Sequence, residues 1–349
     1  MAFSTIDKAK SYFEPVKYTG TGSSNAITSL SQQPDFLWIK KANGAEHHIL
    51  IDSVRGLDKQ IYSSHSSSED TNAQSVTAVS SNGFTVGTNA QTNDNGSIFW
   101  ALNWKGGTTS GLSGGDITPS AYSINTTSKF GIYKYTGNGY SSQTIAHGLG
   151  ATPTCVIFKQ TSGSEQWRVH FMEAPNPYTK MLILNGNAAE GSQNNGLSAV
   201  SSTTITFGSD GAYNSSGGEY ICYIFCDLRG YFTANTYIGN GATDGRFIYT
   251  GFRPSFVMTK YTESGGTGDW TMYNDVLNPT NPTSQWFHND ANTTTQWYDN
   301  QDTARFYSNG FKFVDGSSNA NSNTSGGTYM YMAFGQPLVS SNNIPCTAR

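Results

Sequence analysis

The chain has 349 residues, of which 13% are charged and 13% aromatic, and its formal net charge is −4. A low charge with many aromatic residues is not the composition of a disordered protein. The sequence contains no Lys/Arg run that could supply the positive field of a nucleic-acid-binding protein, so we expect no nucleic-acid partner. The N-terminus lacks a basic start with an apolar stretch, and no run of 18 apolar residues occurs, so we expect synthesis in a cytoplasm and no membrane insertion.

A pattern of Phe, then Tyr five positions later, then Gly two and four residues after the Tyr occurs three times. Its copies read Phe13…Tyr18-Thr-Gly20-Thr-Gly22, Phe130…Tyr135-Thr-Gly137-Asn-Gly139 and Phe232…Tyr237-Ile-Gly239-Asn-Gly241. Each copy is followed by a proline and, six residues later, a lysine: Pro34 and Lys40, Pro153 and Lys159, Pro254 and Lys260. The copies lie more than 100 residues apart, which is the size of a domain and exceeds a solenoid repeat. We therefore predict three tandem homologous domains.

The apolar residues of each repeat come in short runs bounded by Gly, Asn, Ser or Pro, which is typical of strands. Corresponding runs include a Trp- or His-bearing strand near His48, Trp167 and Trp270, and a closing strand that is apolar on both faces. The closing strands span residues 98–102, 220–226 and 329–334. A strand of this kind belongs in the centre of a sheet that packs on another layer. We predict an all-β protein of three antiparallel β-sandwiches, jelly-roll or lectin-like in form.

These patterns divide the chain into a first sandwich at residues 1–107 with an N-terminal arm, a linker at 108–116, sandwiches at 117–231 and 232–337, and a tail at 338–349. The linker is assigned from its flexible Gly/Ser/Thr composition. The join near Gly230 is short, so we expect the second and third sandwiches to pack together. The repeated proline is expected to precede a strand, and the repeated lysine to end it with its charge in solvent.

Few residues have the spacing of a catalytic or metal site. The four cysteines (Cys155, Cys222, Cys226, Cys346) are interpreted as free thiols, because they fit no metal spacing. The G-x-S-x-G match around Ser113 lies in the linker without the strand and helix that a nucleophile elbow needs. His47 and His48 should point to opposite faces of a strand and so not share an ion. Asp52 and Arg55 are interpreted as an ion pair that holds a loop.

Acidic and amide side chains leave two weaker alternatives open. Asp290, Asp299 and Asp302 could include the carboxylate pair of a glycoside hydrolase, although capping of turns is the favoured interpretation. The loops at Asn93–Gly96 and Asn289–Asn292 contain oxygen ligands that suit Ca²⁺, without the spacing of an EF-hand. We expect no cofactor, with calcium as the weak alternative.

The third repeat contains a segment in which aromatic rings stand among polar residues. Rings that stack on sugars, beside amides and carboxylates that bind hydroxyl groups, are what a glycan site requires. Packing of the same rings under a loop or in a subunit interface is the favoured alternative. The candidate glycan or partner contacts are Trp286, His288, Asp290, Trp297 and Tyr298.

Several segments of the chain resemble the sequences of a family of virion structural proteins from tailed bacteriophages, especially marine phages. These proteins are built from repeats of a β-rich domain. The segments are Met1–Lys8, Tyr18–Thr28, Gln33–Lys40, Asp52–Gly56, Ser81–Gly87, His147–Gly150 and Ile344–Arg349. The resemblance covers the whole chain and supplies no catalytic residue.

The resemblance implies a non-enzymatic protein made in the cytoplasm of a bacterial host and displayed on the virion surface. A tail fibre or appendage that attaches to host-surface glycan is the expected role. The alternatives are a capsid decoration or cement protein and, more distantly, a polysaccharide depolymerase. Other virion proteins, including further copies of the chain in a homo-oligomer, are the expected partners.

Overall fold

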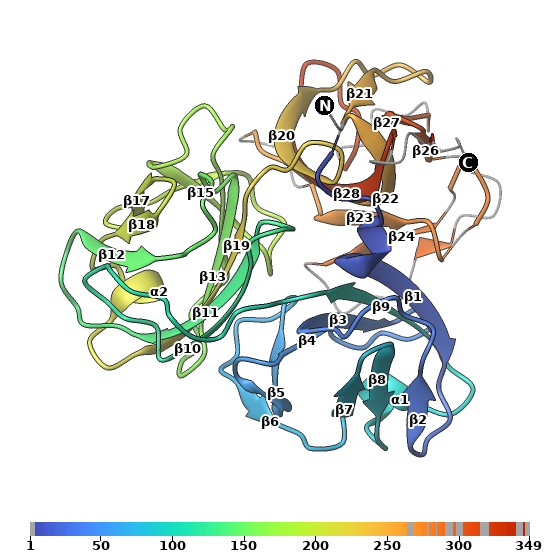
Figure 1. Cartoon of the computed structure of the whole chain (residues 1–349). Helices are drawn as coiled ribbons and strands as arrows, with labels where there is room; N and C mark the ends of the chain where they lie inside the picture. The colour runs from blue at the N-terminus through green and yellow to red at the C-terminus, as the bar shows by residue number, and fades with distance from the viewer. Residues whose placement is uncertain are drawn as a thin grey trace.

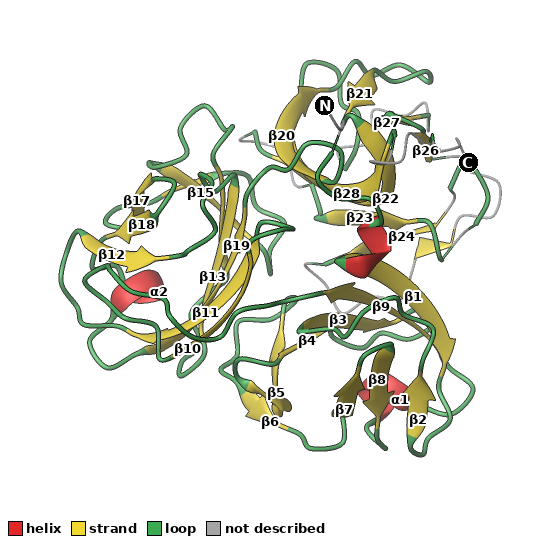
Figure 2. Cartoon of the chain, viewed as in Figure 1, coloured by secondary structure: helices red, strands yellow, loops and turns green. Residues whose placement is uncertain are grey.

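The protein is described from a computed structural model, which covers residues 4–263, 268–277, 279–283, 285–289, 296–297, 303–314, 321–339 and 345. The predicted all-β class is confirmed, because the regular structure of the described chain consists of antiparallel strands apart from the short helical turns η1 (Ala9–Ser11), α1 (Ala90–Asn93) and α2 (Gly211–Asn214) (Figure 2). Within the described residues, no helix is long and apolar enough to cross a membrane.

The strands fall into three groups, which we call the first, second and third modules. The first contains β1 (Phe13–Thr19), β2 (Asn25–Ile27), β3 (Phe36–Lys41), β4 (Ile49–Asp52), β5 (Gly56–Tyr62), β6 (Asp70–Thr71), β7 (Val76–Ser80), β8 (Gly83–Val86) and β9 (Ile98–Trp104). The second contains β10 (Ala121–Asn125), β11 (Phe130–Thr136), β12 (Gln143–Ala146), β13 (Cys155–Gln160), β14 (Arg168–Phe171), β15 (Lys180–Ile183), β16 (Gly191–Ser192), β17 (Leu197–Val200), β18 (Thr204–Phe207) and β19 (Glu219–Phe225). The third contains β20 (Phe232–Ile238), β21 (Phe247–Tyr249), β22 (Phe252–Tyr261), β23 (Thr271–Asn274), β24 (Gln285–His288), β25 (Gln296–Trp297), β26 (Ala304–Tyr307), β27 (Gly310–Phe313) and β28 (Thr328–Pro337).

One strand order recurs in all three modules. The large sheets run β1-β9-β3-β4-β5-β6, β11-β19-β13-β14-β15-β16 and β20-β28-β22-β23-β24-β25, and the second has the extra edge strand β10. The small sheets run β2-β8-β7, β12-β18-β17 and β21-β27-β26. The closing strands β9, β19 and β28 are therefore central, as their apolar sequences predict.

Each module buries its own core and also contributes to a common one. Separate clusters of buried residues belong to the first, second and third modules and include Phe84, Phe207 and Phe311 of the small sheets. A fourth cluster contains residues of all three large sheets. The three large sheets thus face one another, and the modules surround a shared centre (Figure 1).

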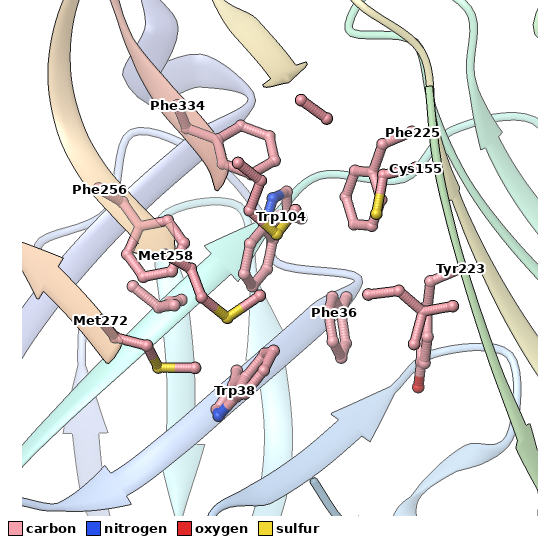
Figure 3. Packing of buried hydrophobic residues seen from close by; sticks show 14 of the residues in the cluster. Phe36, Trp38, Trp104, Cys155, Tyr223, Phe225, Phe256, Met258, Met272 and Phe334 are labelled. Carbon is pink, nitrogen blue, oxygen red and sulfur yellow. The ribbon is translucent and has the colours of Figure 1, made fainter. Parts of the chain in front are cut away.

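Three aromatic rings from the ends of the closing strands meet in this shared core (Figure 3). The ring centroids of Trp104, Phe225 and Phe334 are separated by 6.4 Å, 5.8 Å and 5.6 Å, taken pairwise around the triangle. Each ring residue pairs in its sheet with the Phe that opens the repeated pattern, namely Phe13, Phe130 or Phe232. Equivalent residues therefore surround a pseudo-threefold axis.

The Gly-rich segment at 108–116 is not the free coil that its composition predicts. Thr108 forms a β-bridge with Ile124, and Gly115 forms one with Ile145. A Cβ on Gly107 would lie 2.4 Å from the carbonyl oxygen of Ile124, so this backbone approaches the second module too closely for a side chain. Glycine here permits close packing of the backbone, which composition alone does not distinguish from flexibility.

Candidate functional site

The modules are joined by ring N–H groups that occupy equivalent positions in the three sheets. In each module one strand pairs with the strand that carries the repeated lysine, and the equivalent paired residues are Leu50, Val169 and Met272. The ring residue stands two positions before each of these and is His48, Trp167 or Trp270. The indole of Trp167 donates to the carbonyl oxygen of Tyr62 at 2.8 Å, and that of Trp270 to the carbonyl oxygen of Ile183 at 2.7 Å. The ring Nε2 of His48 lies 3.1 Å from the carbonyl oxygen of His288.

The direction of these bonds closes a ring. The second module donates to the first, the third donates to the second, and the first donates to the third. The accepting carbonyls lie at the ends of β5, β15 and β24, which are equivalent strands. A cyclic, head-to-tail set of contacts of this kind is what a threefold oligomer would contain, here within one chain.

His48 is held as a neutral donor. Its Nδ1 accepts the indole N–H of Trp38 at 3.0 Å, so the proton is on Nε2, which faces the carbonyl of His288. Burial, with the nearby charge of Lys40, places the pKa of His48 well below its usual range. His47 is partly exposed and contacts Ser64 through Nδ1, so the two adjacent rings lie in different environments, as predicted.

Asn289 joins all three modules near the same axis. Its amide nitrogen donates to the carbonyl oxygen of Ser63 at 3.2 Å and to that of Leu184 at 3.0 Å. The hydroxyl of Ser63 donates to its amide oxygen. The side chain is fully buried, and every polar atom of it faces another module. Its amide is therefore used in packing the modules and not in the predicted calcium loop at Asn289–Asn292.

The repeated lysines are buried, which corrects the prediction that their charges lie in solvent. Lys40, Lys159 and Lys260 are each 0% exposed. The Nζ of Lys159 donates to the carbonyl oxygens of Gln160 at 2.6 Å and Gly163 at 3.0 Å. The chain turns back after the strand and brings its carbonyls over the ammonium group. The position of a lysine at the end of a predicted strand does not indicate such a contact.

The other two lysines bind backbone carbonyls in the same way. Lys40 donates to the carbonyl oxygens of Gly44 at 2.9 Å and Glu46 at 2.7 Å. Lys260 donates to the carbonyl of Gly268 and, across to the second module, to that of Asn187 at 2.9 Å. Burial lowers the pKa of Lys40 and of Lys159 to about 8.

The Tyr-x-Gly-x-Gly turns are clasped by a buried asparagine that the sequence analysis did not recognise. The hydroxyl of Tyr135 donates to the carbonyl of Tyr213, and the amide oxygen of Asn214 accepts the backbone N–H of Asn138 at 2.8 Å. Asn93 and Asn323 make the same contact in the other modules. The sequence pattern that could have identified this asparagine is a repeated Asn-x-x-Gly, which occurs at Asn93–Gly96, Asn214–Gly217 and Asn323–Gly326. The amide at Asn93 is occupied by this clasp, so it does not serve the predicted calcium loop.

The predicted pair of Asp52 and Arg55 exists and lies at a module seam. Nε of Arg55 is 2.6 Å from Oδ2 of Asp52, and both side chains are at most 1% exposed. A second guanidinium nitrogen lies 3.1 Å from Glu69. The hydroxyl of Tyr223, in the second module, donates to Asp52 at 2.8 Å. The pair therefore anchors a neighbouring module in addition to its own loop.

The predicted glycan contacts divide into buried residues and residues outside the described structure. Trp286 is 5% exposed and packs in the core of the third module, so its ring has no free face for a sugar. His288 is 9% exposed, and its Nδ1 lies 3.3 Å from Oδ2 of Asp269. Asp290, Tyr298 and the side chain of Trp297 lie outside the described residues. Packing, which was the favoured alternative, accounts for Trp286 and His288.

The chain matches a protein-family model described as "Domain of unknown function (DUF7483)" over residues 8–337. It belongs to this family. The match extends over all three modules, so the DUF7483 model corresponds to the whole ring of sheets and not to one repeat. Searches among curated proteins and among solved structures found no match.

The cysteines and the possible metal ligands of this DUF7483 chain form no catalytic or metal site in the described part of the structure. Cys155, Cys222 and Cys226 are free and buried, as predicted, and burial raises the pKa of each thiol. No group of three or more His, Cys, Asp or Glu that could hold a metal occurs among the described residues. Asp299 and Asp302, like Cys346, lie outside them.

Proposed function

We propose that this chain is a non-enzymatic structural protein of a bacteriophage virion, displayed on the exterior of the particle in a tail fibre or similar appendage that attaches to host-surface glycan. The observation that carries the proposal is the closed ring of contacts among the three modules. It supports a scaffolding role, because the polar groups that recur in every module are used to hold the modules and their turns. The resemblance of the sequence to phage virion proteins supplies the context.

The internal pseudo-threefold arrangement supports a place on an assembly that itself has threefold symmetry. A symmetric oligomer offers equivalent surfaces around its axis, and a pseudo-symmetric chain offers matching surfaces from its three modules. The end of a trimeric fibre has this symmetry. A threefold position on an icosahedral shell has it as well, and this same observation favours the capsid decoration role as the second candidate.

Location on intact particles tests both candidates. A small tag on the C-terminus, detected by gold-labelled antibody in electron micrographs, should mark the tail appendages. Labels spread over the heads would favour the decoration role. Purified, intact particles without this chain would overturn the virion proposal altogether.

The non-enzymatic part of the proposal has its own measurement. Purified chain incubated with envelope polysaccharide of the host should release no reducing ends above a boiled sample. Release that disappears on the change Asp299→Asn would instead establish the depolymerase alternative.

A further inference from the structure

The small sheet of the third module presents an unusual outer face to solvent. It consists of β21, β27 and β26, which lie at the top of the molecule in Figure 1. The strand register places Phe247, Lys312 and Arg305 in one row. Tyr249, Gly310 and Tyr307 form the next row. We call these six residues the outer face of the third module.

The rings of this face are exposed and organised. Phe247 is 45% exposed and Tyr249 is 61% exposed. The rings of Phe247 and Tyr307 meet edge to face, with centroids 5.6 Å apart. A Cβ on Gly310 would lie 2.2 Å from the carbonyl oxygen of Ile248 and 2.7 Å from Cζ of Phe247, so the glycine leaves room for the neighbouring strand and for this ring. The result is an aromatic platform in the middle of a sheet.

The core of the module does not need these rings. The alternate residues of the same three strands, Ile248, Phe306 and Phe311, point inward and are at most 7% exposed. Because successive side chains of a strand point to opposite faces, the core is already filled by the inward set. Exposed aromatic residues gathered in a patch mark a binding surface more often than scattered ones do.

The other two modules provide an internal comparison at the same register positions. Where the third module has Phe247, Tyr249, Arg305, Tyr307 and Lys312, the first has Ala26, Thr28, Ala78, Ser80 and Thr85. The second has Thr144, Ala146, Ala199, Ser201 and Thr206. The same sheet therefore forms with small and hydroxylated residues at all five positions. The aromatic and cationic residues of the third module are additions that the fold does not require.

The charge of the outer face is opposite to that of the whole chain. Arg305 is exposed and Lys312 lies beside it, paired with Asp244. Arg246 is exposed next to Phe247. The face thus carries the cations Arg305 and Lys312, of which Lys312 is paired with a carboxylate, on a chain whose formal net charge is −4. A ligand that uses both the rings and the cations would combine flat apolar surfaces with negative charge.

We propose that the outer face of the third module binds an acidic polysaccharide. The apolar faces of pyranose rings stack on Phe247 and Tyr249, and the carboxylates of uronic acids meet the guanidinium of Arg305 and the ammonium of Lys312. This inference rests on the proposed attachment role and names its ligand class. It also places the site on the sheet, away from the segment around Trp286.

The test uses the purified full-length chain in affinity gel electrophoresis with polygalacturonate in the gel. The variant is Phe247→Ala, Tyr249→Thr and Arg305→Ala combined, which installs the residues that the first module has at these positions. The control is Tyr140→Ala, which removes a ring that is 69% exposed in the second module. We expect polygalacturonate to retard the wild-type chain and the control equally, and the triple variant to bind about tenfold more weakly.

Further outcomes decide the ligand class. Neutral dextran should not retard the wild-type chain, and added salt should weaken the retardation by polygalacturonate, because exposed ion pairs are screened. A wild-type chain that polygalacturonate does not retard, or that dextran retards equally, overturns the proposal. A triple variant that binds polygalacturonate as tightly as the wild type also overturns the proposal. If that variant has in addition lost self-association in sedimentation, the outer face is a protein interface. Labelling of particles tests the virion role separately, so either proposal can fail without the other.

Discussion

The indole Nε1 of Trp270 donates a hydrogen bond to the carbonyl oxygen of Ile183, 2.7 Å away, and so joins the third module to the second. The indole is fully buried, and Ile183 is half-buried. The equivalent donors Trp167 and His48 complete the ring. Each seam therefore contains a ring N–H opposite a backbone carbonyl, beside other contacts between modules such as that of Tyr223 with Asp52.

Removing this donor should destabilise the protein. The change Trp270→Phe leaves the carbonyl of Ile183 without its partner, and a buried unpaired polar group costs about 1–3 kcal/mol. We expect the free energy of unfolding in urea to fall by about this amount, and Trp167→Phe to act in the same direction. Tyr140→Phe is the surface control. A Trp270→Phe chain as stable as the wild type would contradict the role of the seam.

The sequence was sufficient to predict the strands and their threefold repetition. The repeated Phe of the pattern, as in Phe13, pairs beside the ring that lies at the axis, and the apolar closing strands are central. The equivalence of His48, Trp167 and Trp270 was also predicted, because each repeat has a Trp- or His-bearing strand at the same place. Their partners were not, because a backbone carbonyl has no signature in sequence and these carbonyls belong to other modules.

Burial was the property that sequence could not decide. The segment around Trp286 is rich in aromatic and polar residues, which fits a glycan site and a packed strand equally well. β24 is covered on both sides, since Trp286 belongs to the core of the third module and Phe287 to the shared core. The neighbouring modules cover the side of β24 that carries Phe287, whereas Trp286 is buried by its own module.

The buried lysines lead to a second prediction. The change Lys159→Met keeps an unbranched apolar stem but removes the donor to the carbonyls of Gln160 and Gly163. Loss of these bonds should lower the free energy of unfolding by about 2 kcal/mol, measured by chemical denaturation. Lys17→Met, at an exposed position, should change it by less than about 0.5 kcal/mol. Equal effects of the two changes would show that the buried ammonium contributes nothing specific.

Gly137 of the repeated Tyr-x-Gly-x-Gly turn and Gly217 of the Asn-x-x-Gly segment beside it differ in what they tolerate, which gives a pair of variants to compare. A Cβ on Gly137 would lie 2.3 Å from the carbonyl oxygen of Ser215, and backbone on both sides prevents relief. Gly217 has a φ of +75° but nothing within 4 Å of its Cβ position. Gly137→Ala should therefore cost about 3 kcal/mol of stability and Gly217→Ala about 1 kcal/mol. Thermal unfolding of the two variants checks the order, and the reverse order would contradict the packing of this turn.

Stability should decrease as the solution becomes mildly acidic, because several histidines are buried in neutral form. Burial lowers the pKa of His48, His147 and His288, and lowers that of His170 to about 4. Between pH 6.5 and about 4 the unfolded chain therefore binds more protons at these residues than the folded chain, so the free energy of unfolding falls with falling pH. For His170, whose pKa in the folded chain is about 4, we expect a loss of about 1 kcal/mol between pH 7 and pH 5.5.

His170 offers a direct control for this effect. Asp227 and Glu190 act in the opposite direction, since burial raises the pKa of both carboxyl groups. The change His170→Gln removes one buried imidazole, so its denaturation midpoint should depend less steeply on pH than that of the wild type. A wild-type chain whose stability is constant from pH 7 to pH 5.5 would mean that the imidazoles take up protons in the folded chain as readily as in the unfolded chain. The neutral form assigned to the buried His48 at the seam would then not persist through this range.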